Sequence, residues 1–241
     1  MTDARAQILA GIQNSLKRGP LAGDQAAGLE ARVVRHAPNL IPARARDLDR
    51  KRLVDLFERL AGEVQASVAR VRSLDDVPDA VGDYLARHNL PAEMTAAPDP
   101  LIDSAPWQKR PLLKLRRGRA DGREAVGLSA AFAAVAETAT LMLASGSSSP
   151  AALNFLPDTH VVVLPIGRLV GSLEDAWTRL RATIVPDAAG AAGGLGGKSM
   201  PRTINFITGP SRTGDIEQKI EMGAHGPRRL HIILLEDETL R

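Results

Sequence analysis

Residues 160–166, HVVVLPI, carry the clearest strand pattern in the chain, because apolar and β-branched residues follow one another up to a proline. The stretches RTINFITG (202–209) and RLHIILLED (229–237) have the same character. Helical patterns separate these strands, SLEDAWTRLRATI at 172–184 and DIEQKIEMG at 215–223. Apolar strands that alternate with helices predict an α/β fold, a mostly parallel sheet with helices on both faces.

The N-terminal part has a different pattern. A narrow apolar stripe predicts a short helix at 3–17, whereas residues 18–46 are rich in Gly and Pro and predict a linker or arm. We therefore expect two parts, an N-terminal helix and flexible arm at 1–46 and an α/β domain at 47–241. Within that domain, the remaining expected elements are helices at 47–64, 77–90 and 131–136 and strands at 67–71 and 138–145, with a short segment of unassigned structure at 124–130.

The composition excludes several classes of protein. Among 241 residues there is no cysteine, so disulfides, thiol catalysis and an iron–sulfur cluster held by the chain itself are ruled out. No apolar run approaches the roughly 20 residues that cross a bilayer, and the N-terminus has no apolar signal core. We expect a cytoplasmic protein without a membrane span. Aromatic residues make up 3%, which argues against nucleic-acid binding by base stacking.

The stretch ITGPSRTGD (207–215) is the first candidate site. It follows a predicted strand, so in a parallel sheet it would lie at the carboxyl edge, where ligands bind. Gly209 allows close approach of a ligand to the backbone. The hydroxyls of Ser211 and Thr213 and the guanidinium of Arg212 suit a carboxylate or a phosphate. Asp215 is the predicted N-cap of the helix that follows. The alternative is a well-capped turn whose arginine pairs with a nearby acid. Together with the turn AHGP, the candidate ligand-binding residues are Gly209, Pro210, Ser211, Arg212, Thr213, Asp215, His225 and Gly226.

Glu137 is the candidate catalytic residue. It directly precedes an apolar strand, where a carboxylate is costly unless it is paired or functional. Its functional role would be a general base, a nucleophile or a ligand contact, with Thr138 beside it. Its structural role would be to cap the end of the predicted helix at 131–136 or to pair with an arginine. The serine turn 145–149 ends the same strand about 20–25 Å away, so the two cannot line one small pocket.

Two other stretches attract attention by composition. KRPLLKLRRGRADGR (109–123) is densely basic, and it predicts either a solvated loop or a docking surface for an acidic partner. AGGLGGKS (192–199) fits a loose phosphate-loop pattern. However, no strand precedes it and Pro201 prevents a helix after it, so a flexible loop is the simpler interpretation.

Four stretches together resemble the lactate utilisation protein C family, which carries the LUD domain. They are AETATLML (136–143), LPDTHVVVLP (156–165), TGPSRTGDIEQKIEMGAHGP (208–227) and RLHIILLED (229–237), and they cover most of 124–237. The family usually reads ETGT, with glycine where this chain has Ala139. The resemblance implies a fold similar to the NagB/RpiA/CoA-transferase-like group. It also implies a cytoplasmic component of a three-protein system that oxidises L-lactate to pyruvate, whose two partners carry iron–sulfur clusters.

Three functions remain open at this point. The chain could bind a small carboxylate or other anionic ligand and work with iron–sulfur partners in lactate oxidation, with its own cofactor unknown. It could instead be a stand-alone acyl-transfer enzyme, since some enzymes of related fold use a glutamate as an acyl-group nucleophile, a role that would fall to Glu137. Finally, it could be a non-catalytic assembly or regulatory subunit that docks through 109–123.

Overall fold

The computed structural model describes residues 3–17, 19, 21–38, 40–184, 200–214, 220–237 and 240. It divides into two compact units, Met1–Leu40 and Ile41–Arg241. The first unit contains helices α1 (Ala4–Leu16) and α2 (Gly23–Arg35), and neither helix buries a residue. The prediction of a linker or arm at 18–46 is therefore wrong for Gly23–Arg35. The helix-forming Ala, Glu, Leu and Arg residues of this segment outweigh its glycines.

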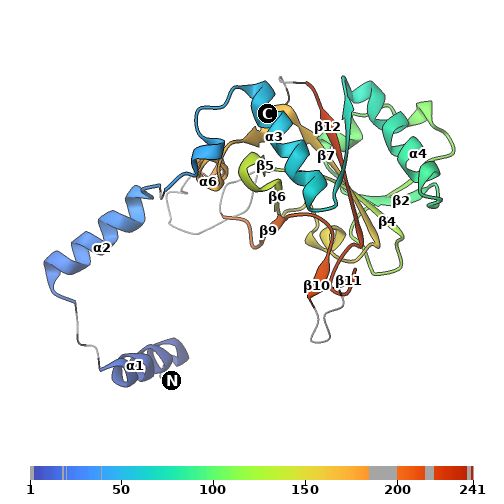
Figure 1. Ribbon diagram of the computed structural model, residues 1–241. Coiled ribbons are helices and arrows are strands. Elements are labelled where there is room, and N and C mark those ends of the chain that lie inside the picture. Colours follow the sequence, from blue (N-terminus) through green and yellow to red (C-terminus); the bar gives the residue numbers. More distant parts are fainter. Residues whose placement is uncertain are drawn as a thin grey trace. The chain divides into compact units, whose positions relative to one another are not determined.

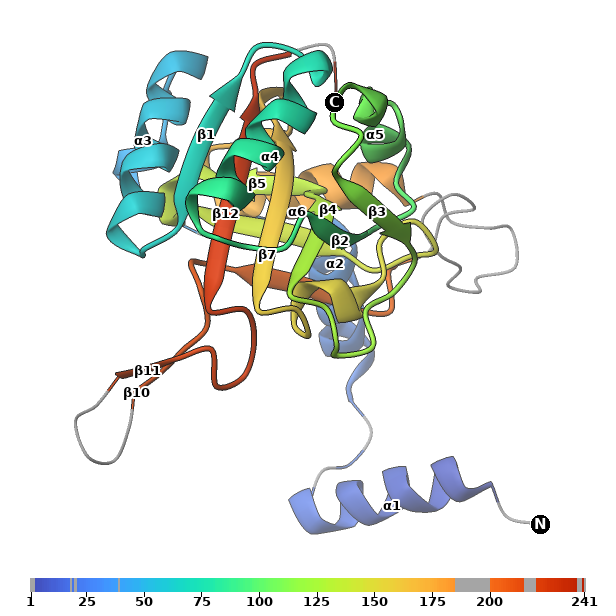
Figure 2. The same cartoon turned by 90° about the vertical axis from the view of Figure 1, so that its right-hand side faces the viewer.

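A six-stranded parallel sheet forms the centre of the second unit. Its spatial order is β1 (Ser67–Val71), β12 (Arg229–Leu235), β7 (Thr159–Pro165), β4 (Val126–Ala130), β2 (Glu93–Ala96) and β3 (Lys114–Arg117). Every neighbouring pair is parallel, and Figure 2 shows the strands side by side. The predicted strands at 67–71, 160–166 and 229–237 are confirmed, whereas the segment 124–130, left unassigned from the sequence, contains β4.

A second sheet of four strands lies beside the first, in the order β8 (Leu169–Val170), β5 (Ala133–Val135), β6 (Thr140–Ala144) and β9 (Ile204–Ile207). Strand β6 runs antiparallel to both β5 and β9. The expectation that 138–145 and 202–209 belong to the parallel sheet is thus wrong, and so is the helix at 131–136. The short connection between β5 and β6 permits an antiparallel hairpin only, since a parallel pair needs a long crossover.

Helices and the small sheet cover the two faces of the parallel sheet (Figure 1). One face packs against α4 (Val77–Arg87) and α5 (Pro100–Asp103), and the other against α3 (Arg50–Glu63) and the small sheet. Alternation along β7 separates the two cores, since Val161 and Val163 face α4 whereas Val162 and Leu164 face α3. Helix α6 (Leu173–Thr183) then covers the far side of the small sheet.

Short 3₁₀ helices connect the described elements: η1 (Ala43–Ala45), η2 (Leu74–Asp76), η3 (Trp107–Lys109), η4 (Ala136–Thr138), η5 (Ala151–Asn154) and η6 (Ile166–Arg168). Ser172 is the N-cap of α6, and Asp175 completes a capping box with it. Among the helices that the structure describes, none is both long and apolar enough to cross a bilayer.

An antiparallel hairpin, β10 (Arg212–Gly214) with β11 (Ile220–Met222), projects from the domain (Figure 1). The predicted helix at 215–223 is therefore wrong over Ile220–Met222. The hairpin is anchored at its base, where the N–H of Gly223 donates to the carbonyl of Ser211 at 2.9 Å. Asp215 and the glycine-rich stretch 192–199 lie outside the described residues.

Candidate functional site

The turn that follows β9 lies at the amino edge of the parallel sheet, and the predicted carboxyl-edge location is wrong. Residues Gly209 and Pro210 share a cavity with His160 and Leu230, which stand near the first residues of β7 and β12. The reason is the second sheet. Because β9 pairs with β6 and not with a parallel strand, its end need not coincide with the ends of β7 and β12.

We call this space the histidine cavity. Its volume is about 240 Å³, which is large enough for a small organic acid. It unites two turns that are separate in the sequence, and its lining includes the predicted residues Gly209, Pro210, Ser211, His225 and Gly226. The two turns are bonded to each other, since the N–H of Ser211 donates to the carbonyl of Pro227 at 2.8 Å.

His160 is a residue of this cavity that the sequence reasoning missed. Its side chain is fully buried, and its Nε2 lies 2.7 Å from the hydroxyl of Ser129. Its Nδ1 has no hydrogen-bond partner among the described residues, and the same holds for Oδ1 of the neighbouring Asn154. Burial lowers the pKa of His160 to about 3, so the imidazole is neutral at pH 7. A histidine at the start of the most apolar strand was the available signal, because a buried polar group needs a partner.

Gly209 fits this turn because of its backbone. Its φ is +75°, and a Cβ added there would lie 2.4 Å from the carbonyl oxygen of Val64 at the end of α3. Glycine is the residue that adopts this conformation without strain and lets the two backbones approach. The sequence expectation of a close backbone approach at Gly209 thus has a physical basis, although the approaching group is α3 of the same chain.

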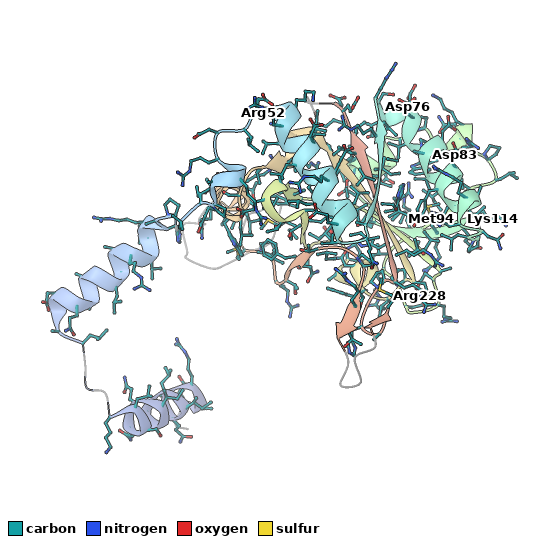
Figure 3. All side chains as sticks on the ribbon, viewed as in Figure 1. Arg52, Asp76, Asp83, Met94, Lys114 and Arg228 are labelled. Atoms are coloured by element: carbon teal, nitrogen blue, oxygen red, sulfur yellow. The ribbon has the colours of Figure 1, made fainter. Side chains whose placement is uncertain are left out.

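Arg212 and Thr213 do not line the histidine cavity with the other predicted site residues, because both belong to β10. Arg212 lines a neighbouring space of about 570 Å³, together with Arg228, Arg229 and His88. We call it the arginine cavity. Figure 3 labels Arg228 close to the base of the hairpin. Pro210 and Leu230 line both cavities, which are therefore adjacent. Thr213 pairs with the strand residue Glu221 and lines neither.

Glu137 is buried and stands at the N-terminus of α6. Its Oε1 accepts a hydrogen bond from the backbone N–H of Leu173 at 2.9 Å, and its Oε2 has no partner among the described residues. Glu137 does not line the histidine cavity, but a chain of hydrogen-bonded threonine hydroxyls connects the next residue, Thr138, with that cavity. The Thr138 and Thr140 hydroxyls are 2.7 Å apart, and Thr140 is 2.6 Å from the hydroxyl of Thr208, which does line the cavity.

The resemblance to the family implies a glycine at the position of Ala139, and the backbone conformation there suits one. The φ of Ala139 is +49°, in the left-handed region that favours glycine. This conformation turns the chain sharply between η4 and β6 and so places Glu137 against α6. A glycine in the family pattern would adopt it without strain.

The basic segment 109–123 is largely neutralised by acids of the same chain. Its ion pairs are Lys109 with Asp75, Arg110 with Asp79 and Asp83, Arg116 with Glu124, Arg117 with Asp103, and Arg123 with Asp121. Figure 3 shows Asp76 and Asp83 on the side of the domain that also carries Lys114. Five of the seven cations are therefore paired, which weakens the interpretation as a docking surface. In the described part of the chain, no group of three or more His, Asp or Glu residues could hold a metal ion.

Comparisons with known proteins agree with this fold. The chain is 33% identical over 115 residues to lactate utilization protein C from Anoxybacillus flavithermus, covering 48% of this chain and 46% of that protein. It is 30% identical over 112 residues to the protein of that name from Bacillus subtilis, covering 46% and 42%. The alignments span about half the length of these curated relatives.

Among solved structures, a crystal structure of a DUF162 family protein from Deinococcus radiodurans matches 78% of this chain and 99% of its own, with a TM-score of 0.56 and 21% identity. At that identity the likeness concerns the fold. The model of the LUD domain matches residues 54–235, from the middle of α3 to the last residue of β12. This range includes both turns of the histidine cavity and most of the chain, which therefore belongs to the LUD domain family.

Proposed function

We propose that this chain is a component of cytoplasmic lactate utilization and that it binds a small carboxylate, lactate or its oxidation product pyruvate, in the histidine cavity. The relatives named lactate utilization protein C support the metabolic role. The observation that carries the choice of cavity is His160. A buried imidazole with one nitrogen satisfied by Ser129 and the other without a partner has hydrogen-bonding capacity left for a ligand.

The chemistry of the lining fits a 2-hydroxy or 2-oxo acid. The neutral imidazole of His160 can donate to or accept from the C2 oxygen, depending on its tautomer. The hydroxyl of Ser211 and the polar backbone of the 209–211 turn can meet the carboxylate. Arg212, Arg228 and Arg229 line the adjacent arginine cavity, and they provide a positive potential that attracts the anion.

Oxidation of lactate to pyruvate releases two electrons and two protons, so an acceptor is required. A chain without cysteine has no thiolates for an iron–sulfur cluster of its own. We propose that the electrons pass to partner proteins that carry such clusters, as the resemblance implies. This chain would then bind and orient the acid within the assembly.

The test is calorimetric titration of the full chain with L-lactate and pyruvate, on two variants that separate the imidazole nitrogens. His160→Gln keeps a polar atom near the position of Nε2, beside Ser129, and removes Nδ1. His160→Asn keeps a polar atom near Nδ1 and removes the contact with Ser129. We expect the Gln variant to lose at least tenfold in affinity for the acid, a change of about 1.4 kcal/mol, whereas the Asn variant retains most of it.

A control for effects away from the cavity is Arg59→Gln, which removes an exposed arginine from α3. This variant should bind the acid as the wild type does. If neither acid binds the wild type, or if both His160 variants bind it normally, the histidine cavity is not the site. Reconstitution with the iron–sulfur partners then tests the metabolic role separately, since lactate oxidation by the assembly does not depend on which cavity holds the acid.

A further inference from the structure

A further cavity opens at the carboxyl edge of the parallel sheet, opposite the histidine cavity. Its volume is about 230 Å³. Its walls come from Ala130 at the end of β4, Asp99 after β2, Arg168 after β7, the serine turn after β6, and α6. In open α/β sheets this edge is where ligands bind, since the loops after the strands converge there. We call it the carboxyl-edge cavity.

Arg168 is the central charged group of this cavity. It is partly buried, and its Nη1 donates to the carbonyl of Ala131 at 2.8 Å. A guanidinium has five N–H donors in a fork that suits oxyanions. Within the described residues Arg168 forms no ion pair at 4.0 Å or less, although the charge of Asp99 acts on it. Burial lowers the pKa of Arg168, which indicates that the guanidinium is partly removed from water without a bonded counter-ion.

The other polar groups of the cavity add donors. Arg179, on α6, donates to the carbonyl of Gly167 at 2.9 Å, which holds a second guanidinium beside the first. Asp99 is the single acid among the lining residues, and its Oδ1 already accepts from the N–H of Leu101 at 2.8 Å. The lining therefore has a net positive charge, two cations against one anion.

Ser148 and Ser149 complete the set. The turn that carries them is closed by two backbone bonds between Gly146 and Ser149, at 3.1 and 3.2 Å. In the described part of the chain, neither serine hydroxyl has a hydrogen-bond partner, and both residues line the cavity. Hydroxyls without described partners line the same small-molecule-sized space as two guanidiniums, and together they supply the kind of donors that an oxyanion accepts from.

We infer that the carboxyl-edge cavity binds a small molecule through a phosphoryl group. A phosphoryl group offers three oxygens and up to two negative charges, so it can accept from both guanidiniums and from the serine hydroxyls, which approach from different segments. A carboxylate has two oxygens in one plane and one charge, and it would leave donors unused. This site is independent of the proposed lactate site, because the two lie at opposite edges of the sheet and share no lining residue.

Titration of the full chain with inorganic phosphate and with malonate, a dicarboxylate of similar size, tests the inference. We expect saturable binding of phosphate that weakens at least tenfold in Arg168→Gln, which removes the guanidinium and its charge. A second variant, Ser148→Ala with Ser149→Ala, removes two hydroxyls from a partly exposed turn and should weaken phosphate binding severalfold without unfolding the protein. Arg59→Gln is here the charge-matched control and should bind phosphate normally.

The outcomes separate the two sites. Loss of phosphate binding in Arg168→Gln together with normal phosphate binding in His160→Gln supports the assignment. Binding of malonate in preference to phosphate would overturn the phosphoryl class, and absence of phosphate binding, or equal loss in Arg168→Gln and Arg59→Gln, would overturn the site. None of these results depends on whether the histidine cavity binds lactate.

Discussion

The carboxylate of Glu137 accepts a hydrogen bond from the backbone N–H of Leu173, with 2.9 Å between Oε1 and N. Leu173 is the first residue of α6, so this bond satisfies one of the N–H groups that a helix leaves without a partner, and the negative charge lies at the positive end of the helix dipole. The sequence suggested catalysis, pairing with an arginine, or capping of a helix at 131–136 for Glu137. The helix whose N-terminus it meets is instead α6, and substitutions can distinguish this capping role from a chemical one.

Two substitutions of Glu137 distinguish its role as a cap of α6 from a chemical role. Glu137→Gln retains a side-chain oxygen for the N–H of Leu173, so we expect it to lower the free energy of unfolding by less than about 1 kcal/mol. Glu137→Ala leaves that N–H without a partner and should cost about 1–3 kcal/mol. Urea unfolding measures both. Should Glu137→Gln abolish an activity of the reconstituted system while preserving stability, the carboxylate has a chemical role in addition to its capping role.

Gly209 should be among the least tolerant positions. A Cβ there would stand 2.4 Å from the carbonyl oxygen of Val64, at a φ of +75°. We expect Gly209→Ala to lower the free energy of unfolding by more than about 2 kcal/mol, because backbone strain and a steric clash act together. Gly62→Ala is the matched control. Gly62 lies in α3 with no atom within 4 Å of an added Cβ, so the change should stabilise by about 0.5–1 kcal/mol. Similar effects of the two changes would contradict the close approach at Gly209.

Two buried histidines should make stability depend on pH. Burial lowers the pKa of His160 to about 3 and that of His231 to about 4, below the ordinary value of about 6.5. Their stabilising contribution is complete above pH 6.5. As the pH falls from 6.5 toward 4, the unfolded chain takes up protons that the folded chain refuses, and stability decreases by up to about 1.4 kcal/mol per pH unit for each histidine.

Urea unfolding at pH 7, 6 and 5 measures this slope, and His160→Gln and His231→Gln should each reduce it. An unchanged slope in both variants would show that neither histidine is held neutral by the fold. His231 provides an internal comparison, because its ring stacks on Tyr84 at 3.8 Å and its Nδ1 lies 2.8 Å from the hydroxyl of Ser67, outside the histidine cavity.

Charge reversal in the basic segment must take account of its ion pairs. Arg116 pairs with Glu124, whose side chain is 7% exposed. Arg116→Glu should therefore destabilise the protein by about 1–3 kcal/mol, since the buried carboxylate keeps its backbone N–H partners at Asp121 and Gly122 but loses its ion-pair partner and meets a second negative charge. Arg119, for which no ion pair is found among the described residues, should tolerate the same reversal within about 0.5 kcal/mol. If a protein partner docks on this segment, Arg119→Glu should weaken that complex without a loss of stability, and this comparison avoids mistaking unfolding for lost docking.

Local patterns determined most of the elements and the membership of the family. The apolar runs at 160–166 and 229–237 form adjacent parallel strands. They could be predicted from the sequence because a strand buried on both faces of a sheet is a continuous apolar run, which is visible without knowledge of the fold. The helix at 172–184 was also predictable from the sequence, since the two residues of its capping box, Ser172 and Asp175, are only three positions apart. Both turns of the histidine cavity were identified from their glycine, hydroxyl and histidine residues.

The tertiary structure alone decided where those turns lie and which side chains join them. Residues 131–136 have good helix formers, yet Ala133–Val135 form a strand, because pairing with β6 and burial outweigh intrinsic propensity. Strand β9 belongs to the second sheet, and the turn after it therefore lies at the amino edge of the parallel sheet. As a result, Ser211 lines the histidine cavity whereas Arg212 lines the arginine cavity. His160 and Ser129 are 31 residues apart and meet at 2.7 Å only because β4 and β7 pair. Contacts between distant segments depend on sheet register and chain path, which no local pattern encodes.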